Sequence, residues 1–256
     1  MSHHNDHPYS ASMITPPPAD RTSHRRTSAL PAWILLCAGL GLTPLAHAAG
    51  SATISTDENK TFQVEWLDPQ TVRMGEQNAN EYMVLRDGKA YMVQAEQGSV
   101  MEMGEMMRTL SQVAKGLNQP GLDISDRIPA IESVQNTGKP VTVAGIRGVS
   151  YNITIREPKQ PPETLTAVLT DDATVTELSQ AYLNTAAAMM TSTQAVQDIR
   201  QALPKDHQGI LQVSGKYAVK TVSSKKPDPA RFVLPSPPTD MNSMLQGIAK
   251  QLQKLN

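Results

Sequence analysis

The sequence has little of several residue types on which common functions depend. It contains one cysteine, and aromatic residues make up 4% of its 256 residues. One cysteine excludes a disulfide scaffold and a cysteine-rich metal site. Basic and acidic residues are balanced, 23 against 24, which excludes a general basic surface for nucleic acid. Hydrophobic residues still make up 39%, so the chain is apolar enough to fold as a globular protein.

A secretory signal is predicted near the N-terminus. Arg21, Arg25 and Arg26 supply a positive charge, and residues 30–45 form an apolar stretch that ends at Ala46-His47-Ala48. This order is typical of a signal peptide that is cleaved after a small-x-small motif. The apolar stretch is interrupted by glycine and proline and is shorter than the roughly 20 residues that a membrane span needs. We therefore expect cleavage near Ala48.

The signal divides the chain into two parts. Residues 1–48 are predicted to be an N-terminal extension plus the signal peptide, with Met13 as an alternative start to Met1. Residues 49–256 are predicted to be a single mature domain, which is periplasmic or secreted and has no transmembrane anchor. The histidines near the start of the chain would be discarded with the extension.

Cleavage would remove most residues that catalyse reactions or bind metals. Cys37 and five of the six histidines lie before Ala49, so His207 is the only histidine of the mature chain. A zinc site needs several Cys, His or carboxylate ligands, and a serine triad would have to use His207. The run around His207 follows Pro204 and is typical of a solvated turn. We expect no cofactor and no enzymatic activity.

Alternating apolar and polar residues predict a chain rich in strands. Phe62, Val64 and Trp66 give one strand a strongly apolar face. Asp87-Gly88 predicts a two-residue hairpin between strands at 82–86 and 89–93, and both faces of this hairpin are apolar. Further strands are predicted at 71–74, 131–134, 141–144, 148–155, 165–169, 210–213, 217–222 and 231–234.

Helical spacing of apolar residues predicts several helices. Ser99 with Glu102 forms a capping-box pattern, so a first helix is expected to begin there. Asp171 and Asp172 precede a second helix, where negative charge stabilises the N-terminus. A short third helix at 196–203 and a C-terminal helix at 240–255 follow. Strands adjacent in sequence, with grouped helices, indicate an α+β fold built on one antiparallel sheet.

Part of the sequence resembles a widespread family of exported bacterial proteins known as a domain of unknown function. The resemblance rests on the run from Asn80 to Met92, on the turn Val143-Ala144-Gly145-Ile146 before a strand with Tyr151, and on Phe232-Val233-Leu234-Pro235. It covers about residues 51–240. The family is related in plan to the lipoprotein-carrier fold, so the resemblance implies a curled antiparallel sheet, an open half-barrel over 51–235, with helices packed on its concave face.

The two-sided apolar hairpin suggests a binding groove. Such a hairpin must be covered on both sides, or one side must line a cavity. We predict a groove lined by Met83, Leu85, Tyr91 and Met92 that binds a lipid, an acyl chain or a lipophilic part of an envelope protein. The alternative is that both faces are ordinary core covered by helices.

Methionines suggest an alternative function, periplasmic copper binding. The run from Met101 to Met107 is dense in thioethers, which are soft ligands suited to Cu(I). On a helix Met101 and Met103 point in different directions, but Met103, Met106 and Met107 could converge. Two of these three also belong to the apolar stripe of the predicted helix, so a core role competes with metal binding.

Overall fold

The computed structural model describes residues 48–56, 60–77, 79–116, 129–157, 160–190 and 192–240. The predicted N-terminal extension, most of the signal peptide and the C-terminal helix at 240–255 lie outside these residues. No helix among the described residues is long and apolar enough to cross a membrane. At the start of the described chain, the backbone N–H of Ala48 donates to Glu177 and its carbonyl accepts a hydrogen bond from the Trp66 indole.

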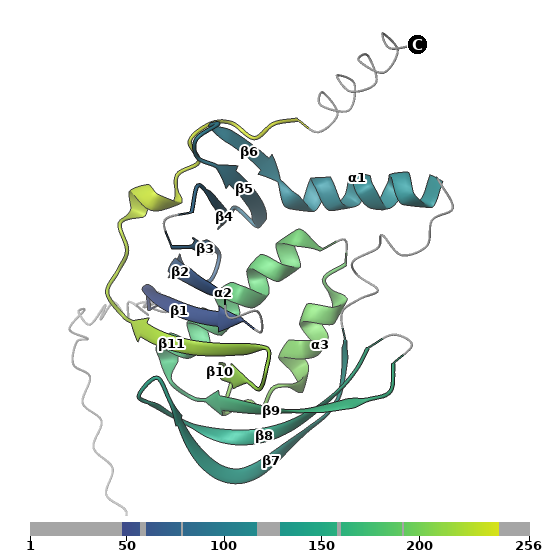
Figure 1. Cartoon of the computed structure of the whole chain (residues 1–256), viewed down its shortest axis with the longest axis vertical. Helices are drawn as coiled ribbons and strands as arrows, with labels where there is room; N and C mark the ends of the chain where they lie inside the picture. The colour runs from purple at the N-terminus through teal and green to yellow at the C-terminus, as the bar shows by residue number, and fades with distance from the viewer. Residues whose placement is uncertain are drawn as a thin grey trace, which may run out of the picture. The chain divides into compact units, whose positions relative to one another are not determined.

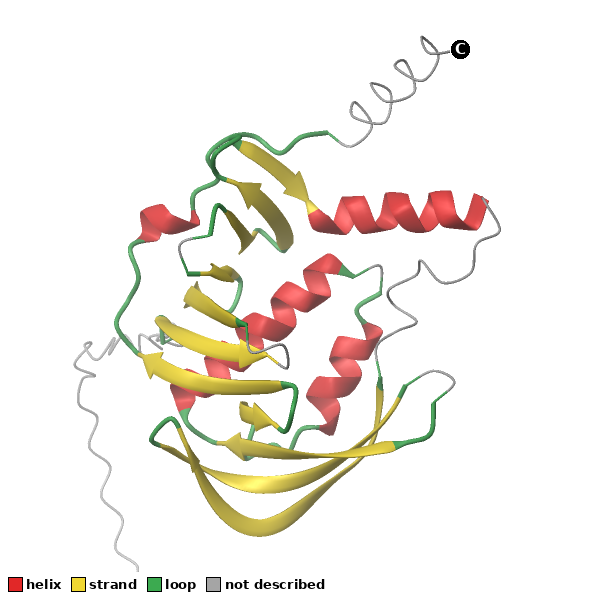
Figure 2. Cartoon of the chain, in the orientation of Figure 1, coloured by secondary structure: helices red, strands yellow, loops and turns green. Residues whose placement is uncertain are grey.

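The described strands form one antiparallel sheet (Figures 1 and 2). Its order is β6-β5-β4-β3-β2-β1-β11-β10-β9-β8-β7, and the two edge strands are not paired with each other, so the sheet is not closed. This confirms the predicted α+β class and the single antiparallel sheet. The strands are β1 Gly50–Thr56, β2 Thr61–Asp68, β3 Thr71–Glu76, β4 Glu81–Arg86, β5 Lys89–Gln94, β6 Ser99–Glu102, β7 Ala130–Val143, β8 Ile146–Arg156, β9 Glu163–Thr170, β10 Gly209–Val213 and β11 Tyr217–Ser223.

The β4–β5 hairpin has the predicted register. Arg86 pairs with Lys89 and Met83 pairs with Met92. Asp87 and Gly88 have φ angles of 53° and 71°, which are the left-handed values that a type I′ turn requires at both central residues. The same kind of turn joins β7 to β8 at Ala144 and Gly145.

Three α-helices are described: α1 Met103–Gly116, α2 Ala173–Met189 and α3 Gln194–Ala202. The longest, α2, crosses one face of the sheet and contacts strands from β10 to β5. We call this side of the sheet the helix face, and α3 lies on it next to α2 (Figure 1). Asp172 caps α2 by accepting from the N–H of Val175, as predicted. A methyl group on Gly104 would lie 2.7 Å from the Ala188 carbonyl oxygen, so glycine lets α1 approach α2 closely.

The structure differs from the predicted elements in three places. Ser99–Glu102 is strand β6, which pairs with β5, so the prediction that a helix begins at Ser99 is wrong, and α1 begins only at Met103. Residues 131–134 and 141–143 are strand as predicted, but they belong to one long strand, β7, with an irregularity between Asn136 and Pro140. Residues 231–234 form no strand, because Asp228 caps a short 3-10 helix, η2 Pro229–Phe232, through the N–H of Ala230.

The main core lies between α2 and the helix face. Val175, Leu178 and Ala181 of α2 pack in one cluster with Trp66 and Leu211, and all five are completely buried. Tyr182 of α2 is 44% exposed, so this aromatic residue lies outside the buried side of the helix. The second helix itself is as predicted.

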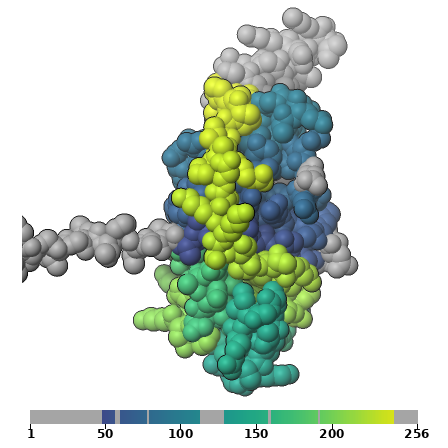
Figure 3. Space-filling model, turned by 90° about the vertical axis from the view of Figure 1, so that its left-hand side faces the viewer, coloured from purple at the N-terminus to yellow at the C-terminus, as the bar shows by residue number. Residues whose placement is uncertain are grey.

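The chain after β11 covers the outer face of the sheet. Residues 224–239, which we call the strap, run across the strands from β11 to β6 (yellow in Figure 3). Arg231 donates a hydrogen bond to Glu65, Leu234 packs on the buried residues of β4–β6, and the N–H of Thr239 donates to the Val100 carbonyl. Phe232 is 4% exposed. The strap therefore buries the second apolar face of the β4–β5 hairpin.

Candidate apolar binding site

An apolar hollow lies between α3 and strands β7 to β10. Its volume is about 330 Å³, which falls within the usual range for small-molecule sites. Eleven of its thirteen lining residues are apolar, and the other two are Glu157 and Lys216. The apolar lining consists of Pro129, Ile131, Ile153, Ile155, Leu165, Ala167, Leu169, Ile199, Leu203, Ile210 and Val213.

Simple sequence patterns place these side chains. Alternate residues of a strand share a face, so Leu165, Ala167 and Leu169 project from β9 together. Ile153 of β8 pairs directly with Leu165. Ile199 and Leu203 are four residues apart on α3 and at its C-terminal end, and they lie one above the other on one side of the helix. Hence the helix supplies one wall and the sheet supplies the other.

The hollow has a closed floor and a more accessible rim. Ala167 and Leu169 are completely buried, whereas Ile155, Leu165 and Ile199 are half-buried. Lys216 is exposed and Glu157 is half-buried at the edge. A small residue such as Ala167 leaves space in front of the sheet that a leucine would fill. This arrangement favours a hydrocarbon group inside and polar atoms near solvent.

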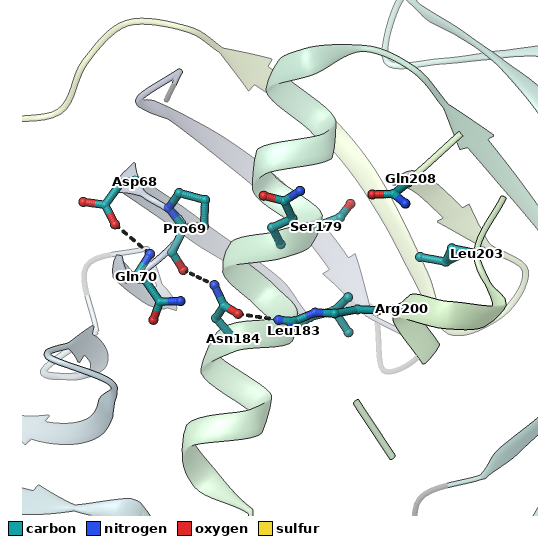
Figure 4. Close-up of a pocket in the computed structure, with 10 residues that line it drawn as sticks. Asp68, Pro69, Gln70, Ser179, Leu183, Asn184, Arg200, Leu203 and Gln208 are labelled. Atoms are coloured by element: carbon teal, nitrogen blue, oxygen red, sulfur yellow. Dashed lines mark hydrogen bonds between the residues drawn. The ribbon is translucent and has the colours of Figure 1, made fainter. Parts of the chain in front are cut away.

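A second, polar hollow of about 550 Å³ lies between α2, α3 and the β2–β3 turn (Figure 4). Asn184 of α2 donates to the Pro69 carbonyl at 2.6 Å, and its amide oxygen accepts a hydrogen bond from Arg200 of α3. Among the described residues, no ion pair joins Arg200 to a carboxylate. Asp68 also lines this hollow, but its carboxylate accepts from the Gln70 N–H and points away from Arg200. Leu203 lines both this hollow and the apolar one.

The four residues of the predicted groove do not all lie on the same face of the sheet. Met83 and Met92 are cross-strand partners and line a third hollow, of about 420 Å³, on the helix face. Leu85 is 1% exposed and belongs to the core beneath α2. Tyr91 lies on the outer face, in the cluster that Leu234 of the strap covers. The structure therefore brings Met83 and Met92 together and separates Tyr91 from them.

The methionines of the copper hypothesis lie at the start of α1. Met103, Met106 and Met107 are all within the first five residues of this helix and are half-buried. Met101 is not on the helix but on strand β6. Among the described residues, no group of three or more His, Cys, Asp or Glu side chains could hold a metal ion.

His207 contacts a tyrosine rather than a serine. Its Nδ1 lies 3.3 Å from the Tyr151 hydroxyl and 3.3 Å from Asp206. Asn136 donates to the same hydroxyl. Burial, with a smaller contribution from Asp206, raises the pKa of Tyr151. These contacts hold the turn before β10 against β8.

The apolar hollow was not predicted as a site. Its residues were predicted as strands and as the apolar stripe of a short helix, which is the ordinary signature of core. The sequence pattern does not give the distance between α3 and the sheet, and this distance decides whether the apolar residues enclose a hollow. Comparison with protein-family models, with curated proteins and with solved structures finds no match for this chain.

Proposed function

We propose that this protein is an exported, non-enzymatic binding protein that holds the hydrocarbon chain of an amphiphile in the apolar hollow under α3. The observation that carries the proposal is the lining itself, which is aliphatic on the floor and on both walls. The predicted signal peptide, with cleavage expected near Ala48, supports a periplasmic location. The resemblance to exported half-barrel proteins supports the same location, and it implies no specific activity.

The hydrophobic effect supplies enough free energy for such binding. Each buried methylene gains about 0.8 kcal/mol, so a chain of about ten methylenes gains about 8 kcal/mol. Before the free-energy cost of association is subtracted, this gain corresponds to a dissociation constant of about 1 μM. Among the described residues that line the hollow, only Glu157 and Lys216, at its edge, are titratable. This composition favours binding over catalysis.

The neighbouring polar hollow favours an anionic head group. A guanidinium has five N–H donors, and Arg200 uses one of them on Asn184. The remaining donors suit a carboxylate or phosphate group, which a planar guanidinium binds through two parallel hydrogen bonds. Leu203 lines both hollows, so the two are neighbours, and we propose that one molecule places its chain in the first and its head in the second.

Displacement of a fluorescent fatty acid from the mature protein tests this function. Dodecanoate and dodecanol are the competitors, because they share a chain and differ in the charge of the head. Ile199→Trp fills the apolar hollow and should weaken both competitors at least tenfold. Gln197→Trp is the matched control, since Gln197 is exposed on the same helix and its variant should bind as the parent does. Absence of chain binding, or equal loss in both variants, would contradict the proposal.

The head group is tested separately. A hydrogen bond to a charged group is worth about 1.5–3 kcal/mol, so Arg200→Gln should weaken dodecanoate by at least about tenfold and leave dodecanol unchanged. Lys205→Gln removes the same charge just after α3, outside both hollows, and should leave the preference intact. Equal effects of the two variants would show a general charge effect instead.

A further inference from the structure

The register of the sheet places methionines side by side on neighbouring strands. Met74 of β3 pairs with Met83 of β4, Met83 pairs with Met92 of β5, and Met92 pairs with Met101 of β6. Four thioethers thus stand in one row across four strands, on one face of the sheet. They come from four separate places in the sequence, so no local pattern reveals the row.

Three members of the row face open space. Met74, Met83 and Met92 line the hollow of about 420 Å³ on the helix face and are half-buried. Met83 and Met92 form the fourth pair from the hairpin turn, counting Arg86 and Lys89 as the first. Pairs alternate along an antiparallel hairpin, and the pair next to a two-residue turn is hydrogen-bonded, so this pair is of the non-hydrogen-bonded type, whose side chains stand closest. These three side chains can therefore turn toward one point in the hollow.

The chemistry of this hollow fits a soft monovalent cation. Thioether sulfur is a soft ligand that selects Cu(I) over harder ions. Residues 49–256 contain no cysteine, so methionine is the only sulfur ligand of the mature chain. Glu76 and Glu81 also line the hollow, and their carboxylates favour positive charge there.

We infer that Met74, Met83 and Met92 form a three-thioether site for Cu(I) on the helix face of β3, β4 and β5. This site differs from the cluster on α1, because Met103, Met106 and Met107 do not line the hollow. It is also separate from the apolar hollow under α3, which shares no lining residue with it. Copper binding here is independent of the binding of an amphiphile.

A Cu(I) competition titration under reducing conditions tests the site, with bicinchoninate as the competing chelator and the mature protein as the ligand. The parent should bind one Cu(I). Loss of a residue that only hydrogen-bonds to a metal ligand lowers metal affinity about 10–100-fold. The double variant Met83→Leu, Met92→Leu removes two of the proposed ligands themselves, so its affinity for Cu(I) should fall more than about 100-fold. Leucine conserves volume and apolar character, so the fold should persist, and a thermal melt checks this.

The control is the triple variant Met103→Leu, Met106→Leu, Met107→Leu, which removes three thioethers from α1, one more than the double variant removes, and should bind Cu(I) as the parent does. A second readout uses Ag(I), which is a soft ion without redox chemistry, and the methionine methyl signals in NMR. The methyl groups of Met74, Met83 and Met92 should shift most. Absence of binding, or loss of binding only in the α1 variant, would overturn the inference.

Discussion

The two ends of the sheet bury their apolar residues in different ways. The β4–β5 hairpin is apolar on both faces, and each face has a cover: α2 packs over Leu85, and the strap packs over Val84 and Tyr91. The β8–β9 pair is apolar mainly on one face, although Val168 on the opposite face is buried in the main core. Its other face carries polar side chains such as Asn152 and Thr166, which pair with each other and are exposed.

The hollow with the more aliphatic lining belongs to the one-sided pair. A two-sided apolar hairpin needs two covers, and in this chain the second cover is a segment more than a hundred residues away in sequence. A one-sided pair needs one cover, and α3 provides it while leaving about 330 Å³ unfilled. Apolar residues on both faces therefore indicate an additional packing element more directly than they indicate a binding groove.

The largest expected loss of stability follows from a substitution in the strap. Phe232→Ala removes a buried aromatic ring and should lower the free energy of unfolding by about 3–5 kcal/mol. Urea denaturation measures this change. The control is Val233→Ala, because Val233 is 60% exposed and its truncation should change the stability by less than about 0.5 kcal/mol. Similar values for the two variants would show that the strap does not stabilise the β4–β5 end.

A smaller loss of stability is expected when the carboxylate that bonds to the strap is removed. Glu65 is 7% exposed and accepts hydrogen bonds from Arg231 at 2.8 Å and Arg73 at 3.3 Å. Glu65→Gln leaves both guanidinium groups without a carboxylate, and a hydrogen bond to a charged group contributes about 1.5–3 kcal/mol, so we expect a loss of about 2 kcal/mol.

The control for this charge is a carboxylate at the other end of the sheet. Glu132 of β7 pairs with Arg156 of β8, and both side chains are substantially exposed. Exposed ion pairs contribute about 0–1 kcal/mol, so Glu132→Gln should cost less than about 1 kcal/mol in the same urea measurement. A larger cost for Glu132→Gln than for Glu65→Gln would reverse the proposed contrast between the two ends.

Turns and helix caps were predicted correctly where a few neighbouring residues determine them. Asp87-Gly88 sets the turn, and a two-residue turn fixes the register of the whole β4–β5 hairpin. Asp172 caps α2 because a carboxylate can satisfy a free N–H at a helix N-terminus. Both features depend on residues within four positions of each other, so no long-range information is needed.

Contacts between residues far apart in the sequence determine the conformation of the segments that were predicted wrongly. Ser99 and Glu102 match a capping box, but Val100 pairs with Val93 and lies in the cluster covered by Leu234, so β6 forms instead. Residues 231–234 alternate like a strand, but Asp228 and Pro229 begin a 3-10 helix in the strap. In both places tertiary packing outweighs the local pattern.

The candidate site could be predicted in part. Leu165, Ala167 and Leu169 were placed on one strand face, and Ile199 and Leu203 on one helix stripe, which is where the structure has them. Their meeting around unfilled space could not be predicted, because a core and a cavity have the same alternation of apolar residues. The difference is a matter of packing distance between α3 and the sheet.

The variant with the smallest expected loss of stability tests whether the hollow under α3 is a binding site or part of the packed core. Ile155 is half-buried at the hollow, so Ile155→Ala creates little new cavity. Its cost in urea denaturation should be about 1 kcal/mol, well below the 2–5 kcal/mol typical of a packed core position such as Leu85. The same variant should weaken dodecanol binding severalfold, because the chain loses contact with one wall. A cost of about 3 kcal/mol or more would mean that the β7–β10 end is packed as tightly as the strap end, and the proposed chain would then have no room.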